Sequence, residues 1–154
     1  MLLTNHTLTG ILLGLSIDNP VLLAPTAVAS HLVLDMTPHL GYPSAKNGPE
    51  TRAPLFIVWG ALDFTASIAV TAAACYAWPA RIPSILVGVI GADLPDLVYI
   101  PMIVFGKALY RFLPFYAPMI AFLGRIQWYE KPPGFITEII WATLMLALLS
   151  RLLP

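Results

Sequence analysis

Residues 54–78 read PLFIVWGALDFTASIAVTAAACYAW, and Asp63 is the only charged side chain in this run. A helix needs about 20 predominantly apolar residues to cross a bilayer. Two further runs, 82–105 and 134–153, reach that length, and 20–38 nearly does. These runs therefore predict transmembrane helices.

The composition agrees with a membrane protein. The 154 residues are 58% hydrophobic and 10% charged, whereas soluble domains carry about 25% charged residues. The net charge is zero, which gives no indication of nucleic acid binding. We expect one transmembrane helical domain over residues 1–154, an integral protein of the plasma (inner) membrane surrounded by lipid.

The expected fold is an all-α, polytopic integral membrane helical bundle with five or six membrane segments. A short apolar segment, 3–16, ends at the turn Ile17-Asp18-Asn19-Pro20. The run 82–105 contains Pro95, where we expect a kink. The number of membrane segments depends on residues 109–124, which are interrupted by Pro114 and Pro118. This stretch either spans the membrane or is re-entrant.

Acidic residues occur inside these apolar segments. An ionised carboxylate in hydrocarbon costs at least ~2.5–3.5 kcal/mol, so such residues normally mark function. Protonation, a water-filled cavity or a bound cation would each lower that cost. Four of the eight acidic residues of the chain are placed in this way: Asp35, Asp63, Asp93 and Asp96.

Nearby histidines favour a bound cation over protonation or a water-filled cavity as the way to stabilise these carboxylates. His31, Asp35 and His39 are spaced i, i+4 and i+8, so on a helix they share one broad face. Imidazole nitrogens and carboxylate oxygens together suit zinc, manganese or iron. The spacing therefore predicts a divalent metal site.

Helix lengths place further polar residues at the same depth. His6 and His31 each lie eleven residues from the turn at 17–20, or roughly 16 Å at ~1.5 Å per residue. Asp63, Asp93 and Asp96 return to about this level if their two helices run antiparallel. We therefore expect His6, His31, Asp35, His39 and Asp93 to hold the metal, and Asp96 and Asp63 to orient the ligands, bind a second metal or act as base.

Ordinary structural roles stay open for several of these residues. His6 could be an interfacial polar residue, and Asp63 could cap or hydrogen-bond a neighbouring helix. Asp96 could satisfy backbone groups that Pro95 leaves free. Glu138, one turn into the last helix, is expected to face the surface or to cap.

Three short runs carry a family resemblance. They are Asn5-His6-Thr7-Leu8-Thr9-Gly10, the segment from Ser30 through His39, and Gly91-Ala92-Asp93-Leu94-Pro95-Asp96. They resemble the THxxxG, SHxxLD and LPD motifs of small bacterial membrane-bound proteins grouped with predicted metal-dependent hydrolases. The PDxDH and HRGxTHS-like segments of those hydrolases are missing here, so the resemblance implies metal binding more firmly than hydrolysis.

Two functions follow as hypotheses. The first is a metal-dependent membrane hydrolase of a lipid or lipid-linked (phospho)ester, with a metal-activated water as nucleophile. Lys107 and Arg111 would hold a phosphate headgroup, or simply extend their charges to the interface. The second is a non-catalytic protein, either an ion or proton transporter or a metal-stabilised membrane subunit. A transporter this small would need to form a homo-oligomer.

Overall fold

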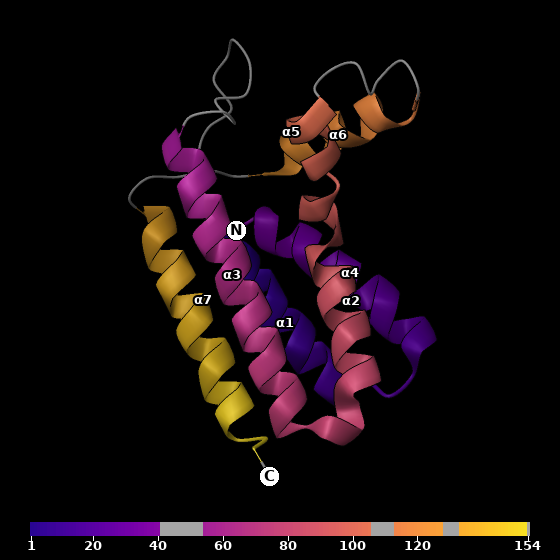
Figure 1. Cartoon of the computed structure of the whole chain (residues 1–154), viewed down its shortest axis with the longest axis vertical. Helices are drawn as coiled ribbons and strands as arrows, with labels where there is room; N and C mark the ends of the chain where they lie inside the picture. Colours follow the sequence, from indigo (N-terminus) through magenta and orange to yellow (C-terminus); the bar gives the residue numbers. More distant parts are fainter. Residues whose placement is uncertain (41–53, 106–112, 128–132, 154) are drawn as a thin grey trace.

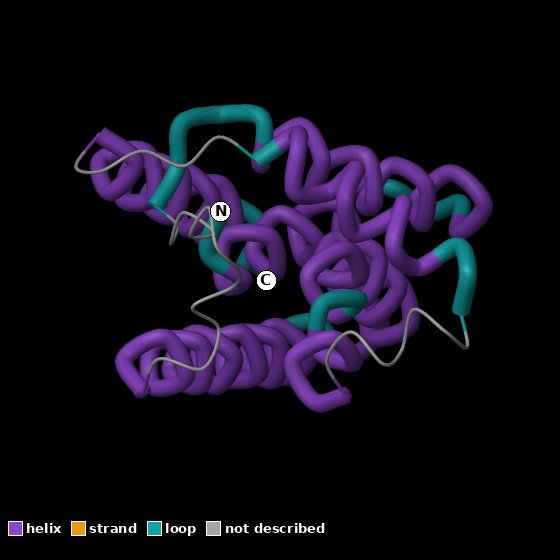
Figure 2. The backbone as a smooth tube through the Cα atoms, turned by 90° about the horizontal axis from the view of Figure 1, so that it is seen from above, coloured by secondary structure: helices purple, strands orange, loops and turns teal. Residues whose placement is uncertain are grey.

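The computed structural model describes residues 1–40, 54–105, 113–127 and 133–153, and these residues form helices and loops without any strand. Viewed from above, the described helices pack together as a bundle (Figure 2). The elements are α1 (Leu3–Ser16), α2 (Pro20–Asp35), α3 (Pro54–Ala77), the 3₁₀ turn η1 (Pro79–Arg81), α4 (Ile82–Leu97), α5 (Ile100–Phe105), α6 (Tyr116–Ile126) and α7 (Pro133–Ser150).

Among the described residues, two helices are long enough and apolar enough to cross a membrane. They are the Val58–Ala77 part of α3 and the whole of α7, Pro133–Ser150. Only 11% and 22% of these windows are buried inside the protein, whereas the core helix of a soluble protein would be mostly buried. At ~1.5 Å per residue, α1, α2 and α4 reach about 21–24 Å, less than the ~30 Å hydrocarbon core. Helix length therefore supports two membrane spans among the described residues, and the expected five or six spans stay a prediction.

Helix α1 is the centre of the bundle and contacts α2, α3, α4 and α7. Its closest approach is to α4, where glycines let the two backbones meet. A Cβ built on Gly10 would lie 2.6 Å from the carbonyl oxygen of Gly88, and one on Gly14 would lie 2.5 Å from that of Ser84. Small residues at a four-residue spacing allow two helices to approach this closely.

The chain reverses between α1 and α2 where the sequence predicts a turn. The side-chain oxygen of Asn19 accepts a hydrogen bond from the Val21 amide at 2.9 Å, which caps α2. Pro20 occupies the first helical position, where its missing N–H costs nothing. At the same end, Arg81 donates to the carbonyls of Gly14 (3.1 Å) and Leu15 (3.0 Å), the last carbonyls of α1.

The apolar run 82–105 is interrupted at Val98 and Tyr99, and not at Pro95. Pro95 stays inside α4, which ends at Leu97. Pro101 has no N–H to donate to the carbonyl of Leu97, so the α-helical ladder cannot continue there. The following α5 and α6 lie across one end of the long helices (Figure 1). Helix α6 has 11 residues, too short to span; residues 109–112 lie outside the described part, and the re-entrant alternative stays a prediction.

Candidate metal centre

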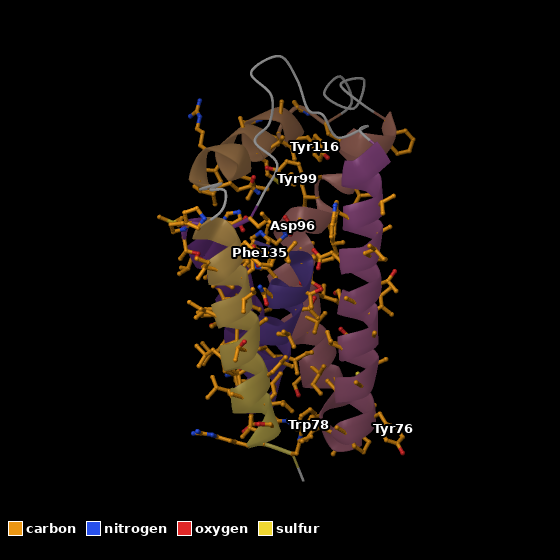
Figure 3. The ribbon with its side chains drawn as sticks, turned by 90° about the vertical axis from the view of Figure 1, so that its left-hand side faces the viewer. Tyr76, Trp78, Asp96, Tyr99, Tyr116 and Phe135 are labelled. Carbon is orange, nitrogen blue, oxygen red and sulfur yellow. The ribbon has the colours of Figure 1, made fainter. Side chains whose placement is uncertain are left out.

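The candidate centre lies at the end of the bundle that α5 and α6 cover. Helix α1 supplies His6, α2 supplies His31 and Asp35, and α4 supplies Asp96. In Figure 3, Asp96 lies just below Tyr99 and Tyr116. His6, His31 and Asp35 are at most 2% exposed, whereas the Asp96 side chain is 29% exposed. The group therefore has one partly open side, at Asp96.

The two helical histidines are stacked on each other. The ring centroids of His6 and His31 are 3.8 Å apart and their planes differ by 18°. The equal distances of both residues from the turn at 17–20 predict this common depth. The rings belong to consecutive helices, so the turn between α1 and α2 sets their common depth.

The backbone fixes which nitrogen of His31 can bind a ligand. Nδ1 of His31 lies 2.6 Å from the carbonyl oxygen of Ala92. A carbonyl only accepts, so Nδ1 carries the proton and Nε2 of the neutral ring keeps its lone pair. That Nε2 lies 3.1 Å from Oδ2 of Asp35 and 3.8 Å from Oδ1 of Asp96. The lone pair is therefore directed towards the carboxylates.

His6 is completely buried. Neither of its ring nitrogens has a hydrogen-bond partner among the described residues. Its Nε2 lies 3.2 Å from Oδ1 of Asp35, although not in hydrogen-bond geometry. A buried polar atom without a partner costs about 1–3 kcal/mol. A cation between these side chains would remove that cost.

Three residues offer ligand atoms close enough to hold a metal ion. One nitrogen each of His6 and His31 and one carboxylate oxygen of Asp96 all lie within 4.8 Å of one another. Two imidazoles and a carboxylate match the donor set of catalytic zinc sites and also suit manganese or iron. The sequence predicts that Asp96 orients the ligands, binds a second metal or acts as base, whereas the structure groups its carboxylate with the two histidines.

Asp35 lies between the two histidines. Besides its contacts with both Nε2 atoms, it accepts hydrogen bonds from the Met1 amino group at 2.6 Å and from Nε2 of Gln127 at 3.3 Å. Gln127 follows α6, so this bond ties the covering helix to the site. Metal ligation by Asp35 stays a prediction.

His39 approaches the same carboxylate from the stretch after α2. Its Nδ1 lies 2.8 Å from the carbonyl of Thr37, and its Nε2 lies 3.9 Å from Oδ1 of Asp35. Burial lowers the pKa of His39 and so favours the neutral ring that a metal requires. Its place in the ligand set stays a prediction.

Asp93 and Asp63 have other neighbours. Asp93 accepts from Thr7 Oγ1 at 2.9 Å and lies 3.5 Å from Ser67 Oγ. Asp63 accepts from the backbone amides of Leu3 (2.7 Å) and Thr4 (3.0 Å), the first residues of α1. Both lie within about a turn of His6, the layer that the helix lengths predict, yet they form separate groups. Asp63 takes the capping alternative, and catalytic or metal roles for both stay predictions.

Glu138 shares the capping of α1. It is 3% exposed and accepts from the Leu2 amide at 3.1 and 3.2 Å and from Nδ2 of Asn5 at 2.6 Å. The sequence leaves a surface role open, whereas the side chain is buried. Acidic groups stabilise helix N-termini, where amides lack partners inside the helix.

The sequence predicts no role for Thr7, Ser67 or Gln127. The first two are small hydroxyl residues inside apolar runs, and the position of Thr7 next to His6 is the only signal that favours it. Lys107 and Arg111, the proposed phosphate contacts, lie outside the described residues.

Comparisons with family models, with curated proteins and with solved structures give no match to this chain. The resemblance to membrane-bound metal-dependent hydrolases therefore stays a prediction from the three short motifs.

Proposed function

We propose that this protein is a membrane-embedded, metal-dependent hydrolase that acts on a lipid or lipid-linked (phospho)ester. A divalent metal such as zinc, manganese or iron would be held by His6, His31 and Asp96. When bound, such an ion polarises the scissile group and lowers the pKa of a coordinated water. The proposal also places the protein in the plasma (inner) membrane as a polytopic bundle.

The observation that carries this proposal is the state of His6. His6 is 0% exposed, is stacked on a second imidazole and lies 3.2 Å from Asp35, yet its ring nitrogens have no hydrogen-bond partner among the described residues. Buried polar groups in proteins are almost always hydrogen-bonded. A metal ligand needs a free lone pair, and His6 keeps one.

The surrounding residues favour catalysis over a purely structural metal site. Structural zinc sites are closed by four protein ligands, whereas catalytic sites use three and keep a position open. Here three ligand atoms converge, and only Asp96 is partly exposed. Both imidazoles present Nε2 to Asp35, so its carboxylate would face the metal, and Gln127 would hold Asp35 in place.

The outer faces of the long helices support placement in a membrane. Helix α3 exposes Val58, Trp59, Leu62 and Ile68, each more than half accessible. Contiguous apolar surface of this kind indicates contact with lipid or protein. Tyr76 and Trp78 lie near one end of the bundle (Figure 3), as aromatic residues do at membrane interfaces. Helix α7 likewise exposes Phe135, Ile136, Ile139, Ile140, Leu144 and Leu146.

Element-resolved metal content of the detergent-purified protein tests the proposal. We expect about one transition-metal ion per chain in the wild type and in Asp18→Asn, a matched change at an 85% exposed carboxylate far from the site. Asp96→Asn and His6→Ala should lose the metal. Hydrolysis of phosphoester and ester lipid analogues should fall with it.

Two results would count against the proposal. Absence of metal from the wild type after incubation with zinc, manganese and iron would remove the centre. Bound metal without turnover of any lipid analogue would leave a metal-binding membrane protein in place of a hydrolase.

A further inference from the structure

A second polar group lies on the other side of α1. His6 faces His31 of α2, whereas the next residue, Thr7, faces α3 and contacts Ser67 at 2.6 Å. Consecutive residues of a helix point about 100° apart. The group formed by Thr7, Ser67 and Asp93 is therefore separate from the histidine centre, although both lie at one level of the bundle.

This group forms the polar part of an otherwise apolar groove. A cavity of about 310 Å³ lies between α3 and α4, and Ser67 and Asp93 line it. Its walls include Phe64, Ile68 and Val89. Ligand sites typically measure ≈ 300–1,000 Å³ and combine apolar walls with a few placed polar groups. The groove matches the small end of that range.

Asp93 has fewer donors than a carboxylate can use. A carboxylate offers about four lone-pair sites. The single hydroxyl proton of Thr7 is shared among Asp93, Ser67 Oγ and the Leu3 carbonyl, which lies 3.0 Å away. Ser67 adds one further proton. The two hydroxyls therefore leave acceptor sites of Asp93 without a donor.

Among the described residues, no cationic side chain lies beside Asp93 to balance an ionised carboxylate. Its side chain is 5% exposed, and across the described ranges no Lys, Arg or His nitrogen lies within 4.0 Å of it. A buried carboxylate needs either a proton or a cationic partner. The groove is the space from which such a partner can approach, because Asp93 lines it.

We propose that the groove between α3 and α4 binds a lipophilic amine, with the protonated nitrogen on Asp93 and an alkyl group along the apolar walls. Phe64 and Ile68 are 44% and 55% exposed, so the groove is bordered by the apolar outer face of α3. A ligand dissolved in the bilayer can enter from that face. The amine donates to the free acceptor sites of Asp93 and neutralises its charge. His6, His31 and Asp96 do not line the groove, so this binding can be tested without a bound metal and without hydrolysis.

Octylamine, octan-1-ol and octanoate at matched concentrations probe the site in lipid nanodiscs. A ligand that binds the folded state raises the unfolding temperature. We expect a saturable increase with octylamine, a smaller one with octan-1-ol and none with octanoate. Asp93→Asn should weaken octylamine binding by roughly tenfold or more, the usual effect of losing a hydrogen bond to a charged group.

Variants separate groove binding from effects on the bilayer. Ala72 is exposed and lines the groove, whereas Ala73 is exposed and outside its lining. Ala72→Phe should block octylamine, and the matched Ala73→Phe should leave its effect unchanged. This pair also carries the test if Asp93→Asn does not fold.

The proposal is overturned if octylamine has no effect on the wild type, or the same effect on the wild type, Asp93→Asn and Ala72→Phe. Equal responses of the wild type to octylamine and octan-1-ol would show that the positive charge plays no part, which also overturns it.

Discussion

The contact between α1 and α4 makes a quantitative prediction at Gly10. A Cβ at this position would lie 2.6 Å from the Gly88 carbonyl oxygen and 2.9 Å from Val89 Cα. Its three nearest neighbours are backbone atoms, so rotation of a side chain cannot relieve these contacts. The two helices would have to separate by about 0.8 Å to bring the shortest contact to the 3.4 Å of ordinary packing.

Gly10→Ala should therefore destabilise the protein. Overpacking of a tight contact costs typically 1–3 kcal/mol, and the better helix propensity of alanine returns up to about 1 kcal/mol. About 0–2 kcal/mol of destabilisation remains, so at roughly 2–4 °C per kcal/mol the unfolding temperature should fall by up to about 8 °C. Because His6 lies one turn from Gly10 and Asp96 lies on α4, metal content should fall as well.

Gly60→Ala is the matched control. A Cβ at Gly60 in α3 would meet nothing within 4 Å. The helix propensity of alanine then acts alone, and the unfolding temperature should stay the same or rise. Thermal unfolding of both variants in the same detergent measures the difference. Equal stability of Gly10→Ala and Gly60→Ala would refute the close contact between α1 and α4.

Two further predictions concern the ends of α7 and α1. Gly134→Ala would place a Cβ 2.6 Å from the amide nitrogen of Leu40 and against the backbone of His39, so we expect lower thermal stability than for Gly60→Ala, and equal stability would show that this contact is loose. Asp63→Asn should cost about 1 kcal/mol, because it weakens the capping of two α1 amides. Its metal content should stay at the wild-type level, and loss of metal would instead make Asp63 a ligand.

The sequence predicts well the depth along the helices at which the histidines and aspartates lie. It predicts poorly which of these side chains contact one another. Counting residues from the turn at 17–20 places His6 and His31 at one depth, and their rings are stacked. The same counting brings Asp63, Asp93 and Asp96 to nearly that depth. It does not say which of them faces the histidines, because a depth leaves the rotation of each helix about its axis free.

Only tertiary packing decides those rotations. The glycine contacts of α1 with α4 fix how the two helices face each other, and Asp96 then lies near His31 while Asp93 lies among hydroxyls. Asp63 meets the amides at the start of α1 because α3 passes beside that end.

The sequence by itself determined the helical class, the turn between α1 and α2, and the placement of His31 and Asp35 on one helix face. Each of these follows from local rules: the length of apolar runs, the chemistry of Asn19 and Pro20, and the i, i+4 spacing. The tertiary structure decided which carboxylate joins the histidines, which one caps α1 and which one lines a groove. Those outcomes depend on contacts between helices distant in the chain, where backbone approach and side-chain volume select one partner among several at the same depth.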